Sequence, residues 1–422
     1  MDNILGIGLC DPHVRIFNNR AYLYASHDYS DNSDNFVMKD WWIWSSDNLV
    51  DWVYENTIYP EETYISEASD GCWATDAIKR NDKYYWYFSD VQNDVKQIGV
   101  MVAQTPIGPW TDPLGHPLIK SCDFPEGYDP AIFQESDQTS YLVFGAFDYY
   151  IAKLSEDMIS LDENPRRLEV IGPQGPYGES TDDKAFLHKK GNYYYLSWGA
   201  YYAMSEDIYG PYYYKGQLID INRVELGFQE PTWPNGIMQG RHGSFFEWNN
   251  QDYFIYCDLS QGNGNRYFRD SWISYVNYRS DGTIDPIFIN ECAVGRYYPS
   301  KGAIKAWSYF SGSSADKREL DGDFSVEISK DESTLSYPNI ISEQEYHSVS
   351  LIFASMVTIG ATVLVSIRSR GKSYDVSLVV SDKHDESNGL VIPFEKKLCV
   401  EDIKFTFKGF EQGTYFSEFE LM

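Results

Sequence analysis

Five short polar stretches hold the residue types best suited to acid-base chemistry, and each stands immediately before an apolar, tyrosine-rich segment. Four of the five positions are acidic and the fifth is histidine. They are Asp11-Pro12-His13, Thr75-Asp76-Ala77, Tyr128-Asp129-Pro130, Asp182-Asp183-Lys184 and Arg241-His242-Gly243. Like charges gathered around one axis raise each other's pKa. A fold tolerates that cost most readily where function needs it, so these positions are the first candidates for a site.

The segments that follow are predicted hairpins that repeat along the first 300 residues. Each pairs an apolar strand with a tyrosine-rich strand across residues that tolerate tight turns, namely Asn18-Asn19, Asn81-Asp82, Ser136-Asp137, Lys190-Gly191-Asn192 and Asn249-Asn250. The repeats start roughly 55 to 60 residues apart, which suits a four-stranded blade with its loops. We therefore expect an all-β chain with a five-bladed β-propeller over residues 1–300. The first strand of each blade lines the channel, so the acidic positions should meet at one mouth.

The sequence changes character after residue 300. Only Trp307 of the twelve tryptophans lies there, and short strands alternate apolar and polar residues, as in Phe324–Ile328 and Ile403–Phe407. This pattern is typical of a β-sandwich, which we place at residues 301–422. An apolar run at 349–367 is interrupted by Ser, Thr and Gly, and we expect two strands joined by a short turn rather than a membrane span.

Composition excludes some partners. The 63 acidic against 34 basic residues give a net charge of −29, which disfavours nucleic acid. The first residues show no signal-peptide pattern, so we expect a cytoplasmic protein or, alternatively, a secreted one whose signal was removed.

The six cysteines form no C-x-x-C pair, and we expect reduced, buried thiols. Neither a membrane nor nucleic acid is expected as a partner, and the oligomeric state is open.

Carboxyl groups from different blades suit the hydrolysis of glycosidic bonds. In the inverting reaction one carboxyl group protonates the departing oxygen and a second activates water, with about 6.5–9.5 Å between them. The alternative interpretation is that an aspartate before a proline or a strand only caps a turn. That interpretation does not explain why all these residues stand at equivalent positions.

The chain resembles glycoside hydrolase family 43 over roughly residues 1–300. The resemblance rests on Cys10-Asp11-Pro12-His13, Trp73-Ala74-Thr75-Asp76, Tyr128-Asp129-Pro130-Ala131, Lys189-Lys190-Gly191-Asn192-Tyr193 and His242-Gly243-Ser244. It implies an inverting arabinofuranosidase or xylosidase, less often acting on galactosyl linkages, that removes terminal units from plant cell-wall polysaccharides or oligosaccharides. It also implies that Asp11 is the general base, that Asp129 orients the acid and tunes its pKa, and that His242 lies beside a calcium or sodium ion or a water. No cofactor is expected to be required, with Ca²⁺ as a candidate ion in the channel.

The general acid is left between two residues. The family usually has Glu before a small residue and Pro, about ten residues ahead of the tyrosine-rich strand, and counting back from Tyr193 reaches Asp183. The nearest glutamate, Glu179, lies four residues upstream. Position favours Asp183 and residue type favours Glu179, while Glu230 is a third candidate.

Candidate substrate contacts are Asp76, Trp73, His242, Trp198 and Arg269. The indoles could stack on a sugar ring, as could Phe147 and Trp233, or these rings could be ordinary core aromatics. Arg269 could donate to hydroxyls or to Asp129, or it could form a structural ion pair. The segment from Asp28 to Asp40 lacks the Gly and terminal Glu of an EF-hand, so we interpret it as a solvated loop at the mouth.

Two other functions are compatible with these residues. One is a non-catalytic carbohydrate-binding propeller that has lost its general acid. The other is a different five-bladed enzyme, a retaining fructan hydrolase or transferase, whose carboxyl groups would lie about 5–5.5 Å apart. For the sandwich we favour a structural role, because its aromatic residues form no obvious platform.

Overall fold

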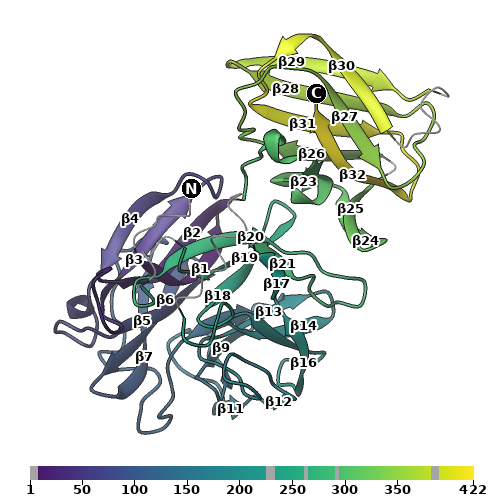
Figure 1. Ribbon diagram of the computed structural model, residues 1–422. Coiled ribbons are helices and arrows are strands. Elements are labelled where there is room, and N and C mark those ends of the chain that lie inside the picture. Colours follow the sequence, from purple (N-terminus) through teal and green to yellow (C-terminus); the bar gives the residue numbers. More distant parts are fainter. Residues whose placement is uncertain (1–7, 225–232, 261–264, 290–293, 330, 382–388) are drawn as a thin grey trace. The chain divides into compact units, whose positions relative to one another are not determined.

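The computed structural model describes residues 8–224, 233–260, 265–289, 294–329, 331–381 and 389–422. Contacts divide the chain into two compact units, the first of residues 1–246, 253–274 and 286–291 and the second of residues 247–252, 275–285 and 292–422. Both are built from β-strands (Figure 1). The division differs from the split expected after residue 300, because Gln251 at a hairpin tip donates to the carbonyls of Trp307 and Tyr309 within the second unit.

The first unit is a five-bladed propeller, as predicted. Blade one contains β1 (Leu9–Phe17), β2 (Arg20–Asp28), β3 (Met38–Ser46) and β4 (Val53–Ile58). Blade two contains β5 (Cys72–Arg80), β6 (Lys83–Gln92) and β7 (Val95–Ala103), and blade three β8 (Ala131–Gln134), β9 (Ser140–Phe144), β10 (Tyr150–Lys153) and β11 (Arg166–Arg167). Blade four contains β13 (Ala185–Lys190), β14 (Tyr193–Trp198), β15 (Tyr201–Ser205) and β16 (Tyr212–Gln217), with β12 (Val170–Ile171) parallel to β16. Blade five contains β18 (Gly243–Trp248), β19 (Gln251–Asp258) and β20 (Asp270–Tyr275). Strand β17 (Ile219–Val224) pairs in parallel with β21 (Ile287–Ile289) in a separate two-stranded sheet. A 3-10 turn, η1, spans Pro60–Glu62.

The five inner strands are neighbours in a ring. Strand β1 contacts β5, β5 contacts β8, and β8 contacts β13. Phe186 of β13 then stacks near Phe245 of β18, with 6.3 Å between ring centroids. The Val14 amide of β1 donates to Ser244 Oγ of β18 at 3.2 Å, which returns the ring to the first blade. Residues at the start of these strands therefore converge on one channel.

The predicted turn chemistry is confirmed at two hairpin tips. Asn18 and Asn19, and likewise Asn249 and Asn250, all have positive φ between 51° and 62°. A turn with two such residues matches the twist of the flanking strands, and asparagine adopts this conformation more readily than most residues. These tips therefore help to fix the strand register that places the acidic residues at the other end.

The second unit is a sandwich of two sheets. One contains β24 (Ala315–Leu320), β25 (Asp323–Ile328), β32 (Thr414–Leu421), β27 (Tyr346–Phe353) and β30 (Gly389–Leu398), with β22 (Ile304–Lys305) beside β32. The other contains β23 (Ser311–Ser313), β26 (Glu332–Tyr337), β31 (Asp402–Lys408), β28 (Thr362–Ser369) and β29 (Lys372–Val379). The 3-10 turns η2 (Pro299–Lys301) and η3 (Ala306–Ser308) precede the sheets. Tyr337 and Phe405 of one sheet pack on Phe419 of the other, 4.8 and 4.9 Å between ring centroids, and form the core.

The apolar run at 349–367 forms two strands, β27 and β28, as expected, although residues 354–361 connect them between different sheets. Within the ranges described above, no helix has the length and apolar content to cross a bilayer. The prediction for the cysteines is partly wrong. Cys10, Cys72 and Cys257 are free and buried, but Cys122 is exposed and Cys399 is half-buried, while Cys292 lies outside the described residues.

Candidate active site

Asp11 lies at a bulge near the start of β1, where the pairing with β2 shifts between Cys10 and His13. Its φ of 47° is in the left-handed region, which turns its side chain into the channel mouth. Three groups hold the carboxylate: His242 Nδ1 lies 2.9 Å from Oδ1, Arg269 Nη1 donates to Oδ1 at 3.2 Å, and Ser26 Oγ donates to Oδ2 at 2.8 Å. Burial opposes the charge, but Arg269 and His242 outweigh it and hold the pKa of Asp11 well below its ordinary value. Asp11 is therefore an ionised, positioned carboxylate.

Arg269 is fixed by a second carboxylate behind Asp11. Its Nε and Nη2 each donate to Asp28 at 3.0 Å, and its backbone amide donates to the same side chain at 2.8 Å. Arg269 is 4% exposed and Asp28, at the end of β2, is fully buried. The interpretation of the Asp28–Asp40 segment as solvated is therefore wrong at its first residue, although Asp31 is exposed. Arg269 therefore forms structural ion pairs with two aspartates of blade one, instead of the predicted contact with substrate or Asp129.

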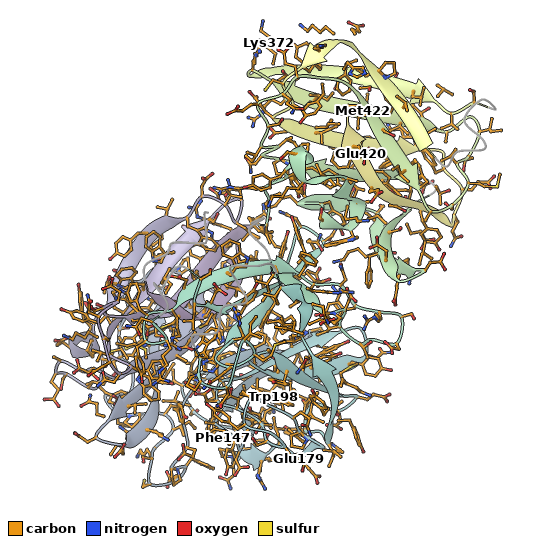
Figure 2. All side chains as sticks on the ribbon, viewed as in Figure 1. Phe147, Glu179, Trp198, Lys372, Glu420 and Met422 are labelled. Carbon is orange, nitrogen blue, oxygen red and sulfur yellow. The ribbon has the colours of Figure 1, made fainter. Side chains whose placement is uncertain are left out.

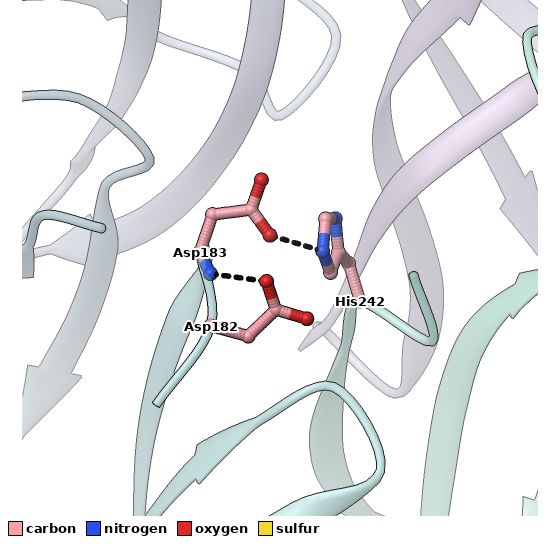
Figure 3. Close-up of side chains that lie close together, drawn as sticks. All are labelled: Asp182, Asp183 and His242. Carbon is pink, nitrogen blue, oxygen red and sulfur yellow. Dashed lines mark hydrogen bonds and ion pairs between the residues drawn. The ribbon is translucent and has the colours of Figure 1, made fainter. Parts of the chain in front are cut away.

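His242 connects the base candidate to the fourth blade. Its Nε2 lies 2.5 Å from Oδ1 of Asp183 (Figure 3). Its Nδ1 contacts Asp11. Burial alone would lower the pKa of His242, but Asp183 and Asp11 raise it well above its ordinary value. The imidazole ring therefore stands between the two carboxyl groups, with one against each nitrogen.

Asp183 is the most accessible member of this cluster. Its side chain is 34% exposed, compared with 10% for His242 and 6% for Asp11. Burial opposes its charge, but the adjacent imidazolium outweighs burial and lowers its pKa. A sugar that enters the mouth would therefore meet Asp183 before it meets the buried Asp11.

Two further carboxyl groups lie close to Asp183 and hold protons near neutral pH. Asp182 Oδ1 accepts the backbone amide of Asp183 at 2.9 Å, and burial together with Asp183 raises the pKa of Asp182 to about 7 (Figure 3). Burial together with Asp183 and Asp11 raises the pKa of Asp129 to about 8. Asp129 precedes β8 with a φ of 56°, and its amide donates to Ser89 Oγ at 2.7 Å. Asp182 was not singled out from the sequence, although the Asp182-Asp183 pair was the available signal.

The structure separates the two candidates for the acid. Asp183 joins the cluster, whereas Glu179 is exposed on the preceding loop (Figure 2). Segment 181–183 is held by Tyr149, whose hydroxyl donates to the Asp182 carbonyl at 2.5 Å. Glu230 lies outside the described residues.

Asp76 belongs to a deeper layer of the channel. It is fully buried, and Arg15 donates to both carboxylate oxygens, at 2.9 Å from Nε and 2.5 Å from Nη2. The Ile132 amide also donates to Asp76 Oδ2 at 2.7 Å. The prediction that Asp76 contacts substrate is therefore corrected: its carboxylate joins the inner strands β1, β5 and β8.

The aromatic candidates divide by exposure. Trp198 is fully buried and donates to the Gln174 carbonyl at 2.9 Å, so its predicted stacking on a sugar is wrong. Trp73 is half-buried against Tyr128 with 5.7 Å between ring centroids, and remains a candidate.

A better candidate for sugar stacking is the exposed pair Phe147 and Tyr177. They are 51% and 50% exposed, with ring centroids 5.8 Å apart. Phe147 has a φ of 58°, which is unusual for an aromatic residue and marks a functional candidate. Its amide donates to the Asp182 carbonyl at 3.0 Å, so this ring is tied to the segment that carries Asp183.

A propeller whose channel mouth gathers an ionised aspartate, a bridging histidine and protonated carboxyl groups has the parts of a glycoside hydrolase. The comparisons with known proteins agree. The sequence profile of the glycosyl hydrolases family 43 matches residues 4–284, and the chain belongs to this family.

Relatives and solved structures extend this result. The chain is 26% identical over 323 residues to a xylosidase/arabinosidase of Bacteroides ovatus, an alignment that covers 65% of this chain and 94% of the relative. The fold resembles a family 43 β-xylosidase/α-arabinofuranosidase from a compost microbial metagenome, solved with xylotriose in a calcium-free form, with TM-score 0.56, 23% identity and coverage of 68% of this chain and 97% of the other. It also resembles an arabinoxylan arabinofuranohydrolase from Bacillus subtilis, solved with cellotetraose, with TM-score 0.57, 20% identity and coverage of 100% of this chain and 96% of the other.

Proposed function

We propose that this glycosidase removes terminal α-L-arabinofuranosyl or β-D-xylosyl units from plant cell-wall polysaccharides or oligosaccharides, by single displacement with inversion. The observation that carries the proposal is the bridge by His242 between Asp11 and Asp183. The names of the relatives support the two sugars. Galactosyl linkages are a less favoured substrate.

In the proposed reaction Asp11 is the base. Water lies on the face of the sugar opposite the leaving group, attacks the anomeric carbon and gives its proton to Asp11. Arg269 and Ser26 keep Asp11 ionised and oriented for this step, as a general base requires. A bound sugar excludes bulk water from the mouth, which strengthens the electrostatic interactions among these groups.

Asp183 is the proposed acid, and Asp129 tunes its pKa. The lowered pKa of Asp183 favours its ionised form, so Asp183 must gain a proton before it can give one to the glycosidic oxygen. A neutral sugar bound over Asp183 disfavours the ionised carboxylate. The nearest proton donor to Asp183 is Nε2 of His242, 2.5 Å away. Asp183 then transfers this proton to the departing oxygen as the glycosidic bond breaks. Asp129, protonated near neutral pH, adds no second charge beside Asp183.

The reaction requires water and carboxyl groups and no cofactor. Calcium was the candidate ion, and among the described residues Asp182, Asp183 and His242 have ligand atoms within 4.8 Å of one another. These residues do not fit calcium well. Both nitrogens of His242 already contact carboxylates, and calcium prefers six to eight oxygen ligands. No step is therefore assigned to a metal ion.

The proposal is tested with 4-nitrophenyl α-L-arabinofuranoside, β-D-xyloside and β-D-galactoside, and with NMR detection of the first anomer released. We expect hydrolysis of one of the first two with inversion, lost in Asp11→Asn. Retention would overturn the single displacement. A folded protein that binds arabinoxylan oligosaccharides without cleaving them would favour the second candidate, a non-catalytic binding propeller. That candidate is supported by the lowered pKa of Asp183, which disfavours the protonated form that a general acid needs.

A further inference from the structure

A lysine is buried in the propeller channel at the entrance to blade four. Lys184 directly precedes β13 and is 1% exposed. Its side chain reaches β1 on another blade, where Nζ lies 2.7 Å from Nε2 of His13. Burial of a cation costs free energy unless the cation is paired and hydrogen-bonded. The buried ammonium group of Lys184 therefore needs favourable interactions that offset this cost.

The backbone at Lys184 is also unusual. Its φ is 55°, in the left-handed region that side chains other than glycine rarely adopt. Asp11, near the start of β1, and Asp129, ahead of β8, also have positive φ values, 47° and 56°. Lys184 is therefore the cationic one of three left-handed residues near the starts of the inner strands β1, β8 and β13.

Lys184 counters the negative charge of both layers of the channel. It favours the ionised forms of Asp11 and Asp129, opposing the effect of burial on each. Burial and Lys184 together lower the pKa of His13 to about 4, although the neighbouring Asp76 acts to raise it. Neutral His13 accepts a hydrogen bond from Lys184 at Nε2, and its Nδ1 lies 3.1 Å from Asp76 Oδ1. Lys184 therefore acts on Asp11 and Asp129 directly and on Asp76 through His13.

We propose that the ammonium group of Lys184 is a built-in cation of the channel and takes the place of the metal ion that the family resemblance suggests there. A divalent ion at His242 would have to displace a carboxylate from one ring nitrogen and would lie in the same acidic ring as this ammonium group. Lys184 is thus a positioning residue that contacts His13 and offsets the negative charge of Asp11 and Asp129 without calcium. The inference rests on the geometry of the channel and not on the proposed reaction.

The first test uses the wild-type protein and its melting temperature. We expect the same melting temperature after dialysis against a chelator, and no change when calcium chloride is added back. A fall of several degrees in the chelator that calcium reverses would overturn the proposal.

The second test removes the cation. Lys184→Gly suits the left-handed backbone, and Lys184→Gln keeps the length of the chain without the charge. We expect both variants to melt at lower temperature and to be restored in part by millimolar calcium or by methylammonium, while the exposed control Lys83→Ala behaves like the wild type in every condition. A folded variant that neither cation stabilises would overturn the proposal, as would calcium stabilisation of the control to the same degree. If Lys184→Gly does not fold, Lys184→Gln and the chelator experiment decide the question.

Because melting is measured without substrate, this result is independent of the function. A metal-independent wild type with cation-responsive variants supports the built-in cation even if no glycoside is hydrolysed.

Discussion

Nε2 of His242 lies 2.5 Å from Oδ1 of Asp183, and this contact links the fifth blade to the fourth at the channel mouth. The same imidazole contacts Asp11 through its other nitrogen. One histidine therefore fixes the positions of the proposed base and the proposed acid relative to each other. The protonation state of each group depends on the other two.

The first prediction distinguishes the two candidates for the acid. Asp183→Asn should lower kcat by about 10²–10⁴-fold, the usual contribution of general acid catalysis. Glu179→Gln, the matched control on the exposed loop, should change kcat by less than about twofold, since its side chain is outside the cluster. The measurement is steady-state hydrolysis of the preferred 4-nitrophenyl glycoside. The opposite pattern would assign the acid to Glu179.

The second prediction concerns the support of the base. Arg269→Lys keeps a positive charge but loses the fork that binds Asp28 while reaching Asp11. We expect kcat to fall, and the acidic limb of the kcat/KM profile to move to higher pH, because Asp11 loses part of the interaction that holds its pKa low. Far-UV circular dichroism at each pH should confirm that the variant is folded. An unchanged acidic limb would show that Arg269 does not control the charge of Asp11.

The third prediction is a pH dependence of stability. Folding raises the pKa of Asp129 to about 8 and that of Asp182 to about 7. A raised carboxyl pKa means that the folded state favours the protonated form, so this contribution is complete below about pH 4 and is lost as pH rises toward 8. The wild type should therefore lose on the order of a few kcal/mol of unfolding free energy between these values from Asp129. In Asp129→Asn the fall should be smaller.

Urea unfolding at pH 5, 6, 7 and 8 measures this slope. Asp137→Asn is a suitable control, because Asp137 is an aspartate on the exposed β8–β9 turn. The assignment fails if Asp129→Asn and the wild type lose stability in parallel over the whole range.

Much of the propeller could be predicted from the sequence, because its evidence is local. Asparagine turns, apolar inner strands and tyrosine-rich second strands are each visible within about ten residues, and their repetition defines the blades. The acidic positions ahead of each strand follow from the same repeat. Asp11, Asp129, Asp183 and His242 were therefore found before their contacts were known.

The partners of these residues could not be predicted, because they come from distant parts of the chain. Arg269 reaches Asp11 across 258 positions, and Lys184 reaches His13 across 171. The sequence shows the charge of Lys184 but not its burial. The same limit explains why Trp198 and Asp76 were predicted as substrate contacts, although both are buried. An indole or a carboxylate near a predicted channel mouth has the same sequence pattern whether its side chain faces the cavity or the core.

The last prediction concerns Phe147, whose exposed ring is held in a left-handed backbone conformation beside the Asp182 carbonyl. An aromatic ring in this position can stack on the apolar face of a sugar, so Phe147→Ala should raise KM. A lost aromatic contact of about 0.5–1.5 kcal/mol corresponds to a rise of roughly 2- to 13-fold. With an oligosaccharide the rise in KM should exceed any fall in kcat, because Phe147 does not belong to the carboxyl cluster. Phe288 is also an exposed phenylalanine, at 53%, and Phe288→Ala is the control. Equal effects of the two substitutions on KM would show that Phe147 has no special contact with substrate, whereas a loss confined to kcat would assign Phe147 to the support of Asp182 and Asp183.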